Sequence, residues 1–257
     1  MSDELVIERD GNIVVLRLNR AEARNALSPG LIAAIGQAVL DVEADGSIRV
    51  LVLTGTGTRA FCAGMDLRAF AAGEAMGNRT PEVEAAYYRL IGGQAAIPVV
   101  GAANGTAVAG GLELLLGCDV VIASADAEFG LPEVKRGLIP GGGGTTIGTR
   151  IPLNVAMELI LTGDTISAAR AYEIGLVNAV VPAGEVLASA LRLAARIAAN
   201  GPLAVKAAKE LGHLAIADAG RWAERLAEWQ PVVFGSDDAR EGAVAFVEKR
   251  PPVWQGR

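Results

Sequence analysis

Two glutamates stand in surroundings that could adapt a carboxyl group to acid–base chemistry. Glu113 follows Gly110 and Gly111 and is flanked by leucines, and Glu133 lies in the segment Leu-Pro-Glu-Val, residues 131–134. Burial among apolar side chains raises the pKa of a carboxyl group, so that it can give and take protons near neutral pH. Either glutamate could instead cap or end a helix, and the residues alone leave that choice open.

Gly110 and Gly111 stand where a loop should turn into a helix. A strand-like run, residues 98–103, precedes the loop, and a leucine-rich run follows the two glycines. The first N–H groups of a helix have no intrahelical acceptor and can bind an anion or a developing negative charge. Glycine lets a ligand approach that backbone closely. A backbone donor site next to Glu113 has the outline of an active site.

Other kinds of catalytic site find less support. His213 is the one histidine, and it falls late in an expected helix with no nucleophile near it in the sequence. Cys62 and Cys118 do not have the spacing of metal ligands. We therefore expect no metal site, and acid–base work falls to the carboxylates.

Two glycine-rich stretches match nucleotide-binding loops only superficially. Residues 55–60, Gly-Thr-Gly-Thr-Arg-Ala, fit a dinucleotide fingerprint, but residues 61–64 are a poor helix start and no acid ends the following strand. The glycines at 141–144 lack the Lys-Ser/Thr of a phosphate loop. We expect a structural turn there.

The pattern of elements predicts an α/β protein. A hairpin over 5–18 turns at Asp10-Gly11, Ser28-Pro29 reads as the start of a helix, and 61–66 reads as a loop. Alternation of strands and helices over the first two thirds indicates βαβ units, and the last part is all helical. The further strands are expected at 49–54, 98–103 and 119–123, and the further helices at 82–94, 154–161, 167–174, 184–200, 202–217, 221–232 and 237–249.

Composition limits the partners of the chain. Its 257 residues are 51% apolar and only 20% charged, which favours buried subunit interfaces over a lone monomer. The net charge of −6, with no basic cluster, argues against nucleic acid. Two cysteines form no disulfide framework, and the N-terminus lacks the features of a signal peptide. A cytoplasmic location is expected.

One uncharged stretch could suggest a membrane helix. Residues 91–112 carry no formal charge, but they contain six glycines and Pro98. A bilayer-spanning helix is dominated by large apolar side chains. We expect a buried strand and loop here, and no membrane partner.

Three ordered motifs resemble the enoyl-CoA hydratase (crotonase) superfamily. They are Phe-Cys-Ala-Gly-Met-Asp-Leu at 61–67, Asn-Gly-Thr-Ala-Val-Ala-Gly-Gly-Leu-Glu-Leu at 104–114, and residues 129–145. The likeness runs from Asn19-Arg20 to the C-terminal tail. It implies a spiral core of ββα units over residues 1–195. It also implies a C-terminal helical region, 196–257, that packs at subunit interfaces in trimers or dimers of trimers.

The resemblance also implies roles for individual residues. The amides of Met65 and Gly110 fall where the family has its oxyanion hole. Glu113 and Glu133, twenty residues apart, match the two catalytic glutamates of the hydratase members. Ala109 stands where a glycine is common, which puts only loop detail in doubt.

Further matches concern the substrate. The positions that would bind coenzyme A are Ala63, Asp66, Leu67 and Arg68, with Arg24 and Lys249 as weaker candidates for the phosphates. Segments such as 70–90 would line the acyl pocket. Coenzyme A is then part of an acyl-CoA substrate, and no separate cofactor is expected.

The expected activity is reversible hydration of 2-enoyl-CoA. Enoyl-CoA isomerisation or carnitinyl-CoA dehydration remain open, because residues 64–74 and the Trp-Gln-Gly-Arg tail, 254–257, look somewhat like the carnitinyl-CoA group. A non-catalytic acyl-CoA binder is a further alternative, against which the intact glutamate pair argues.

Overall fold

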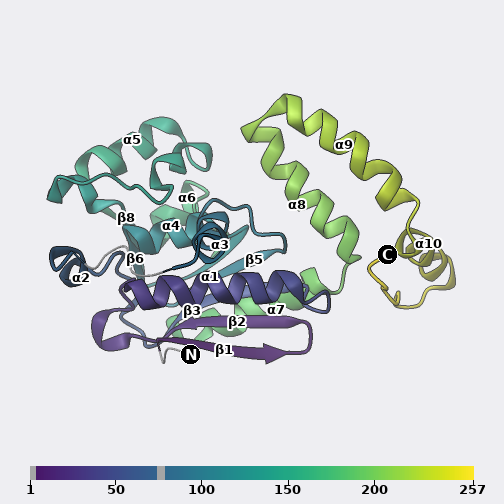
Figure 1. The fold of residues 1–257 in the computed structure, drawn as a ribbon, viewed down its shortest axis with the longest axis horizontal. Helices are drawn as coiled ribbons and strands as arrows, with labels where there is room; N and C mark the ends of the chain where they lie inside the picture. Colours follow the sequence, from purple (N-terminus) through teal and green to yellow (C-terminus); the bar gives the residue numbers. More distant parts are fainter. Residues whose placement is uncertain (1–3, 74–78) are drawn as a thin grey trace.

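The strands form two β-sheets, and the chain contributes to both in turn (Figure 1). A computed structural model describes residues 4–73 and 79–257. The first sheet has the strand order β1 (Leu5–Asp10), β2 (Ile13–Leu18), β3 (Val50–Gly55), β5 (Val99–Ala103), β7 (Val120–Ser124) and β10 (Ala179–Val181). The second has the order β4 (Ala60–Cys62), β6 (Thr106–Val108), β8 (Glu128–Gly130) and β9 (Thr165–Ser167).

Each turn of the chain adds one strand to each sheet. The pairs β3 and β4, β5 and β6, and β7 and β8 follow one another, so the orders β3-β5-β7 and β4-β6-β8 run in step. All neighbours within these two series are parallel. The helices α3 (Pro81–Ile91) and α4 (Gly110–Leu116) follow the first two pairs. The predicted α/β class and its repeated ββα units are confirmed.

The first sheet is covered on both faces. Along β2 and β3, alternate residues belong to two separate apolar clusters, with Leu16 and Leu53 in one and Val15 and Val52 in the other. The helices α1 (Pro29–Ala44) and α3 belong to the first cluster, and α7 (Val186–Ala198) supplies the helical part of the second. Strands buried on both faces read as continuous apolar runs, which is why they were predictable.

Two glycines fix the position of α3. A Cβ on Gly36 of α1 would lie 2.2 Å from the carbonyl oxygen of Val83, and one on Gly117 would lie 2.1 Å from that of Leu90. No larger residue fits at either point, so α3 packs directly on the backbone at both ends. The predicted start of α1 is confirmed, because the Ser28 hydroxyl accepts the Leu31 N–H at 3.0 Å.

The short elements differ from expectation. Residues 60–62, expected within a turn and a loop, form β4, because they pair with β6 in the second sheet. The short strands β6, β8, β9 and β10 were not predicted from local pattern. The helix expected over 82–94 ends at Ile91, where Gly92 and the left-handed Gly93 follow (φ 72°). Residues 74–78, part of the segment expected to line the acyl pocket, lie outside the described residues, and so does Glu74 of the carnitinyl-like segment.

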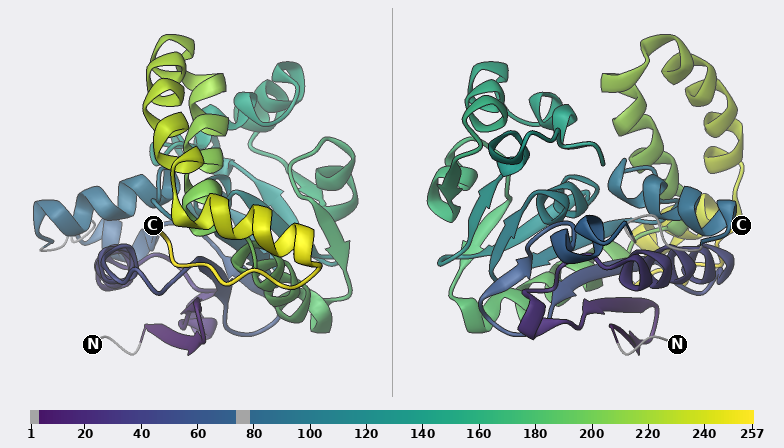
Figure 2. Two further views of the ribbon diagram at one scale, coloured as in Figure 1. Left: turned by 90° about the vertical axis from the view of Figure 1, so that its right-hand side faces the viewer. Right: turned by 60° about the vertical axis from the view of Figure 1, so that its left-hand side comes forward.

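The C-terminal helices form an arm that projects from the sheets (Figure 2). It comprises α8 (Pro202–Ala217) and α9 (Ala219–Phe234), and α10 (Asp237–Glu248) follows. Glu210 of α8 accepts N–H groups from Arg225 and Trp229 of α9. The boundary expected after residue 195 falls inside α7, whose Ala198 is still buried against the first sheet.

The remaining described helices are short. They are η1 (Ala21–Ala23), α2 (Leu67–Ala71), η2 (Pro132–Arg136), η3 (Gly144–Thr149), α5 (Leu153–Thr162), α6 (Ala168–Glu173) and η4 (Ala183–Glu185). None of the helices within 4–73 and 79–257 has the length and hydrophobicity needed to cross a lipid bilayer.

Ala109 has a strained backbone just before α4. Its φ of 51° and ψ of −131° are rarely adopted by a residue with a Cβ. The Ala109 methyl also restricts its neighbour, because a Cβ on Gly64 would lie 2.6 Å from it. The departure from glycine at this position therefore has an energetic cost.

Replacing Ala109 with glycine should stabilise the protein. Strain of this kind costs the folded state about 1–3 kcal/mol, which glycine would relieve. The greater freedom of glycine in the unfolded chain offsets about 0.5–1 kcal/mol of this gain. We expect Ala109→Gly to raise the free energy of unfolding by about 1 kcal/mol, measured by urea denaturation. The matched control, Ala195→Gly on the exposed side of α7, should lower it. A loss of stability in Ala109→Gly would contradict the strain.

A partly buried ion cluster joins the arm to the first sheet. Asp119 accepts from Lys209 Nζ and contacts His213 Nε2, both at 2.9 Å, and both partners lie on α8. Its Oδ2 also accepts the Val99 N–H at 2.7 Å. Burial alone would raise the pKa of Asp119, but His213 and Lys209 outweigh it and lower the pKa. His213 is thus a helix-face histidine, as expected, with a structural partner.

Removing the Asp119 charge should destabilise the protein markedly. The Lys209 side chain is only 8% exposed and would be left without its carboxylate. We expect Asp119→Asn to lower the free energy of unfolding by about 3 kcal/mol at neutral pH. The deficit should shrink in acid, because a carboxyl group with a lowered pKa loses its stabilising effect as the pH falls through that pKa. Glu173→Gln, which breaks an exposed pair with Arg170, should cost under about 1 kcal/mol. Equal losses in the two variants would count against the cluster.

Candidate active site

The three sequence motifs meet because they follow neighbouring parallel strands. Met65 comes just after β4, Gly110 just after β6, and Glu133 just after β8. These strands are adjacent in the order β4-β6-β8. Carboxyl ends of parallel strands meet at one edge of a sheet, and ligands commonly bind there. The Ala109 N–H also donates to the Gly130 carbonyl at 3.0 Å, which joins two of the motifs directly.

Met65 and Gly110 offer two free backbone amides at this edge. The Leu27 N–H donates to the Gly64 carbonyl, and the Asp66 N–H donates to the Leu27 carbonyl, so the residues around Met65 are fixed. Within the described residues, neither the Met65 N–H nor the Gly110 N–H has an acceptor. The two lie close together, since a Cβ on Gly110 would be 3.7 Å from the Met65 nitrogen.

Glu113 is buried one turn into α4, on the same side of the helix as Gly110. It is 7% exposed. Its Oε1 accepts N–H groups from Gly142 and Gly144, each at 2.8 Å. Burial raises the pKa of Glu113, and the two hydrogen bonds oppose this effect without cancelling it.

The glycine-rich loop is shaped to hold that carboxyl group. A Cβ on Gly142 would lie 2.5 Å from Glu113 Oε2. A Cβ on Gly144 would lie 3.1 Å from Oε1 and 2.9 Å from Leu131 Cδ2. The loop expected as a structural turn does serve a structural purpose, and its amides bind Glu113.

Glu133 lies on η2 and faces the same region. Its Oε2 is buried and has no hydrogen-bond partner in the described part of the chain. Burial raises the pKa of Glu133, its own backbone N–H lowers it, and the charge of Glu113 raises it further. The charge of Glu113 is therefore felt at the carboxyl group of Glu133.

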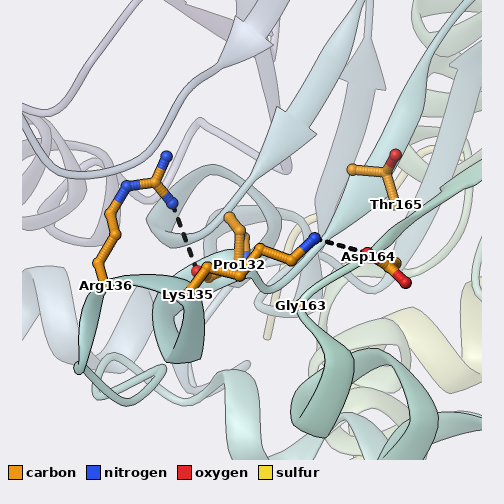
Figure 3. A pocket seen from close by; sticks show the side chains of 6 residues that line it. All are labelled: Pro132, Lys135, Arg136, Gly163, Asp164 and Thr165. Carbon is orange, nitrogen blue, oxygen red and sulfur yellow. Dashed lines mark hydrogen bonds and ion pairs between the residues drawn. The ribbon is translucent and has the colours of Figure 1, made fainter.

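The outer side of η2 is anchored to the turn before β9 (Figure 3). A shallow hollow of about 710 Å³ lies here, and Lys135 Nζ pairs across it with Asp164 Oδ1 at 2.5 Å. Gly163 is left-handed (φ 66°), and a Cβ there would lie 3.1 Å from the Cα of Pro132. Neither Glu113 nor Glu133 lines this hollow. The contacts around it therefore hold η2 from the side that faces away from the candidate site.

The residues expected to bind coenzyme A cluster beside the free amides. The Ala63 N–H donates to the Arg24 carbonyl at 3.0 Å, and the Arg24 side chain is exposed. Asp66 caps α2 by accepting the Arg68 N–H, and it also binds the missed residue Arg20 at 3.1 Å. Burial would raise the pKa of Asp66, but Arg20 and the cap lower it. The Leu67 and Arg68 side chains are exposed.

Lys249 is not brought to this cluster by its own chain. It ends α10 in a left-handed conformation (φ 56°). In Figure 1, α10 and α2 lie at opposite ends of the molecule. The arm of α8 and α9 precedes α10 and carries it away from α2. Local sequence could not indicate this separation in space.

Other potential catalytic groups are unsuited to the chemistry. Burial raises the pKa of Cys62 and of Cys118 to about 12, so both thiols stay protonated. The glycines at 55–60 lead into the strand β4 instead of a helix, which confirms that they form no dinucleotide fingerprint.

Sequence reasoning missed two buried polar side chains at α3. Arg79 and Tyr87 are both buried, although the Arg-Thr-Pro start of α3 resembles an exposed turn. Glu113 raises and Arg79 lowers the pKa of the Tyr87 phenol, beneath a larger increase caused by burial. No local signal indicates burial of an arginine at a helix start.

Together these groups can stabilise an enolate. Two fixed amide donors suit a carbonyl oxygen that gains negative charge. Two neighbouring carboxyl groups with raised pKa values suit proton transfer to and from carbon and water.

Comparisons with known proteins identify the family of the chain. Residues 8–257 match the family described as enoyl-CoA hydratase/isomerase. The chain is 39% identical to the enoyl-CoA hydratase EchA19 of Mycobacterium tuberculosis over 99% of its own length and 97% of that protein's. It is 37% identical to the carnitinyl-CoA dehydratase of Proteus mirabilis over the full length of both.

A solved structure confirms the predicted fold. The crystal structure of an enoyl-CoA hydratase from Mycobacterium tuberculosis superimposes with a TM-score of 0.91 at 40% identity and covers both chains fully. The chain belongs to the enoyl-CoA hydratase/isomerase, or crotonase, family.

Proposed function

We propose that this protein is an enoyl-CoA hydratase that adds water reversibly and syn across the double bond of a 2-enoyl-CoA thioester. One observation carries the proposal: two carboxyl groups with raised pKa values and two unengaged backbone amides follow adjacent strands at one edge of the second sheet. Hydration needs both parts, because the thioester must accept charge and a water must be deprotonated.

The amides of Met65 and Gly110 would bind the thioester oxygen. As water attacks, electrons move from the double bond toward the carbonyl, and the oxygen gains negative charge. Each such preorganised donor is worth about 2.7–4 kcal/mol in the transition state. The hydrogen bond from the Ala109 N–H to Gly130 and the Leu27 hydrogen bonds hold the backbone beside both donors before the substrate arrives.

The two glutamates would share one water molecule. Glu113 as carboxylate takes a proton from the water while the water oxygen bonds to the β-carbon. Glu133 gives a proton to the α-carbon. The assignment follows the hydrogen bonds, because Gly142 and Gly144 stabilise an ionised Glu113 while Glu133 Oε2 has no donor within the described residues. Transfer of a proton from Glu113 back to Glu133 restores the enzyme.

The nucleotide end of coenzyme A would lie along Ala63, Asp66, Leu67 and Arg68, with Arg24 near the phosphates. Asp66 would act by shaping this segment, since it already binds Arg20. Lys249 could contribute only from a second copy. A trimer or a dimer of trimers would supply that copy and cover the apolar side chains that the arm exposes, such as Phe234 and Phe246. The two free, buried cysteines suit a cytoplasmic enzyme.

Carnitinyl-CoA dehydration is the second candidate, because relatives with that name match the full chain. Its acyl group carries a quaternary ammonium, which proteins bind with aromatic faces or carboxylates. Comparing crotonyl-CoA with crotonobetainyl-CoA as substrates separates the two functions.

Neutralising either glutamate should abolish turnover without unfolding the protein. General acid–base groups contribute about 10²–10⁴-fold, so Glu113→Gln and Glu133→Gln should each lower kcat for crotonyl-CoA hydration by at least that range's lower end. A raised carboxyl pKa disfavours the folded state once the pH exceeds it, so neither variant should lose stability at neutral pH. Glu128→Gln, an exposed position on β8, is the matched control. Near-normal hydration by either catalytic variant would refute its role.

The same carboxyl groups predict a bell-shaped dependence of kcat/KM on pH. Activity should fall in acid, as Glu113 gains a proton below its raised pKa, and fall in base, as Glu133 loses its proton above its own raised pKa. The two apparent pKa values belong to the coupled pair. Initial rates with crotonyl-CoA across the range where circular dichroism shows a folded protein measure both limbs. A flat profile would contradict this division of roles.

A further inference from the structure

Arg79 is a buried cation whose hydrogen-bonding capacity is mostly unused. Its side chain is 6% exposed, and its Nε and Nη1 have no acceptor within the described residues. Only Nη2 has a partner, Glu84 Oε1, at 3.3 Å. That distance is at the long end for a hydrogen bond, and Glu84 is itself partly exposed to water.

This arrangement is unfavourable as it stands. A buried charge is stable when it is paired and its N–H groups are bonded, and a guanidinium has no acceptor with which to compensate. Arg79 also lies just before the N-terminus of α3, where the helix dipole adds positive charge. The other nearby carboxylate, Glu82, is engaged with its own backbone N–H and with Thr80, which lower its pKa.

Val83, Tyr87 and Ile91 follow one another at four-residue spacing on the buried side of α3, and Arg79 precedes Val83 by the same spacing. Ile91 Cδ1 lies 3.2 Å from the position of a Cβ on Gly142, beside Glu113. Tyr87 is one turn earlier on the same buried side of α3. The Tyr87 phenol has no hydrogen bond within the described residues and responds to the charges of both Glu113 and Arg79. Tyr87 therefore lies between Arg79 and Ile91 along this side of α3.

We propose that Arg79 binds a carboxylate carried on the acyl group of the substrate. The inference rests on the proposed function, which places the double bond at Glu113 and Glu133, and it adds the class of acyl group. A carboxylate would accept from the free Nε and Nη1 N–H groups and neutralise the buried charge. Tyr87 would contact the carbon chain between the two ends.

The experiment compares neutral and carboxylated substrates of matched length. The pairs are pent-2-enoyl-CoA with glutaconyl-CoA, and hex-2-enoyl-CoA with 2,3-didehydroadipyl-CoA. The wild-type kcat/KM should be higher for the carboxylated member of at least one pair. Arg79→Met should lower that value by about 10- to 100-fold and leave the neutral member little changed, because a charge-assisted hydrogen bond contributes on that scale.

Two further variants control for charge and for folding. Arg79→Lys keeps the charge with fewer and differently directed donors, so it should retain part of the preference. Arg170→Met removes an arginine that makes one exposed pair with Glu173, and it should leave the preference intact. Arg79→Met should be at least as stable as wild type in thermal denaturation, since it removes an unpaired buried charge.

The outcomes separate this inference from the proposed function. Equal effects of Arg79→Met on both members of each pair, or a wild-type preference for the neutral members, would overturn the role of Arg79 and leave hydration standing. If wild type hydrates none of these thioesters, the proposed function fails. The role of Arg79 is then decided by calorimetric binding of adipyl-CoA and hexanoyl-CoA to wild type and Arg79→Met. Tighter, Arg79-dependent binding of adipyl-CoA supports it, and equal affinities overturn it.

Discussion

A carboxyl group held in apolar surroundings by two backbone amides is the interaction on which this structure depends. Water is almost absent around Glu113, which favours its neutral form, while the N–H groups of Gly142 and Gly144 favour its charge. The opposing effects leave its pKa raised but keep ionisation accessible. The glycine loop that makes those bonds packs closely against Leu131. Leu131 is two residues before Glu133, so the same contact positions the segment of Glu133 beside the loop.

The second sheet provides the frame for this interaction, although its strands are too short to be stable alone. Strands β4, β6 and β8 have three residues each, well below the usual strand length. The longer strands β3, β5 and β7, buried on both faces, set their spacing and order. Stability resides mainly in the first sheet, and the ends of the second sheet supply the reactive groups. The chain alternates between the two sheets, so each turn of the fold adds one part of the site.

Features with a local physical cause were predictable from the sequence. The cap at Ser28 and the apolar runs of the first sheet depend on neighbours in the chain, and Glu113 stood out through its own apolar flanks. The pairing of β4 with β6, the use of Gly142 as a donor and the burial of Arg79 depend on partners far away in sequence. No pattern of propensity or periodicity encodes those partners. The glycines at a helix start indicated backbone donors at Gly110, whereas Met65 as the second donor came from the family resemblance alone.

The close contacts at Gly36 and Gly117 fix the position of α3 through its backbone atoms. Since helix-to-backbone contact at both ends sets its position, exchanges among the side chains between them can alter the adjoining space without displacing α4 or its carboxylate. If α3 lines the acyl pocket, as proposed above, rate and selectivity reside in separable parts of the polypeptide. Such modularity lets point substitutions along one helix diversify the molecules accepted while the reaction itself is inherited unchanged.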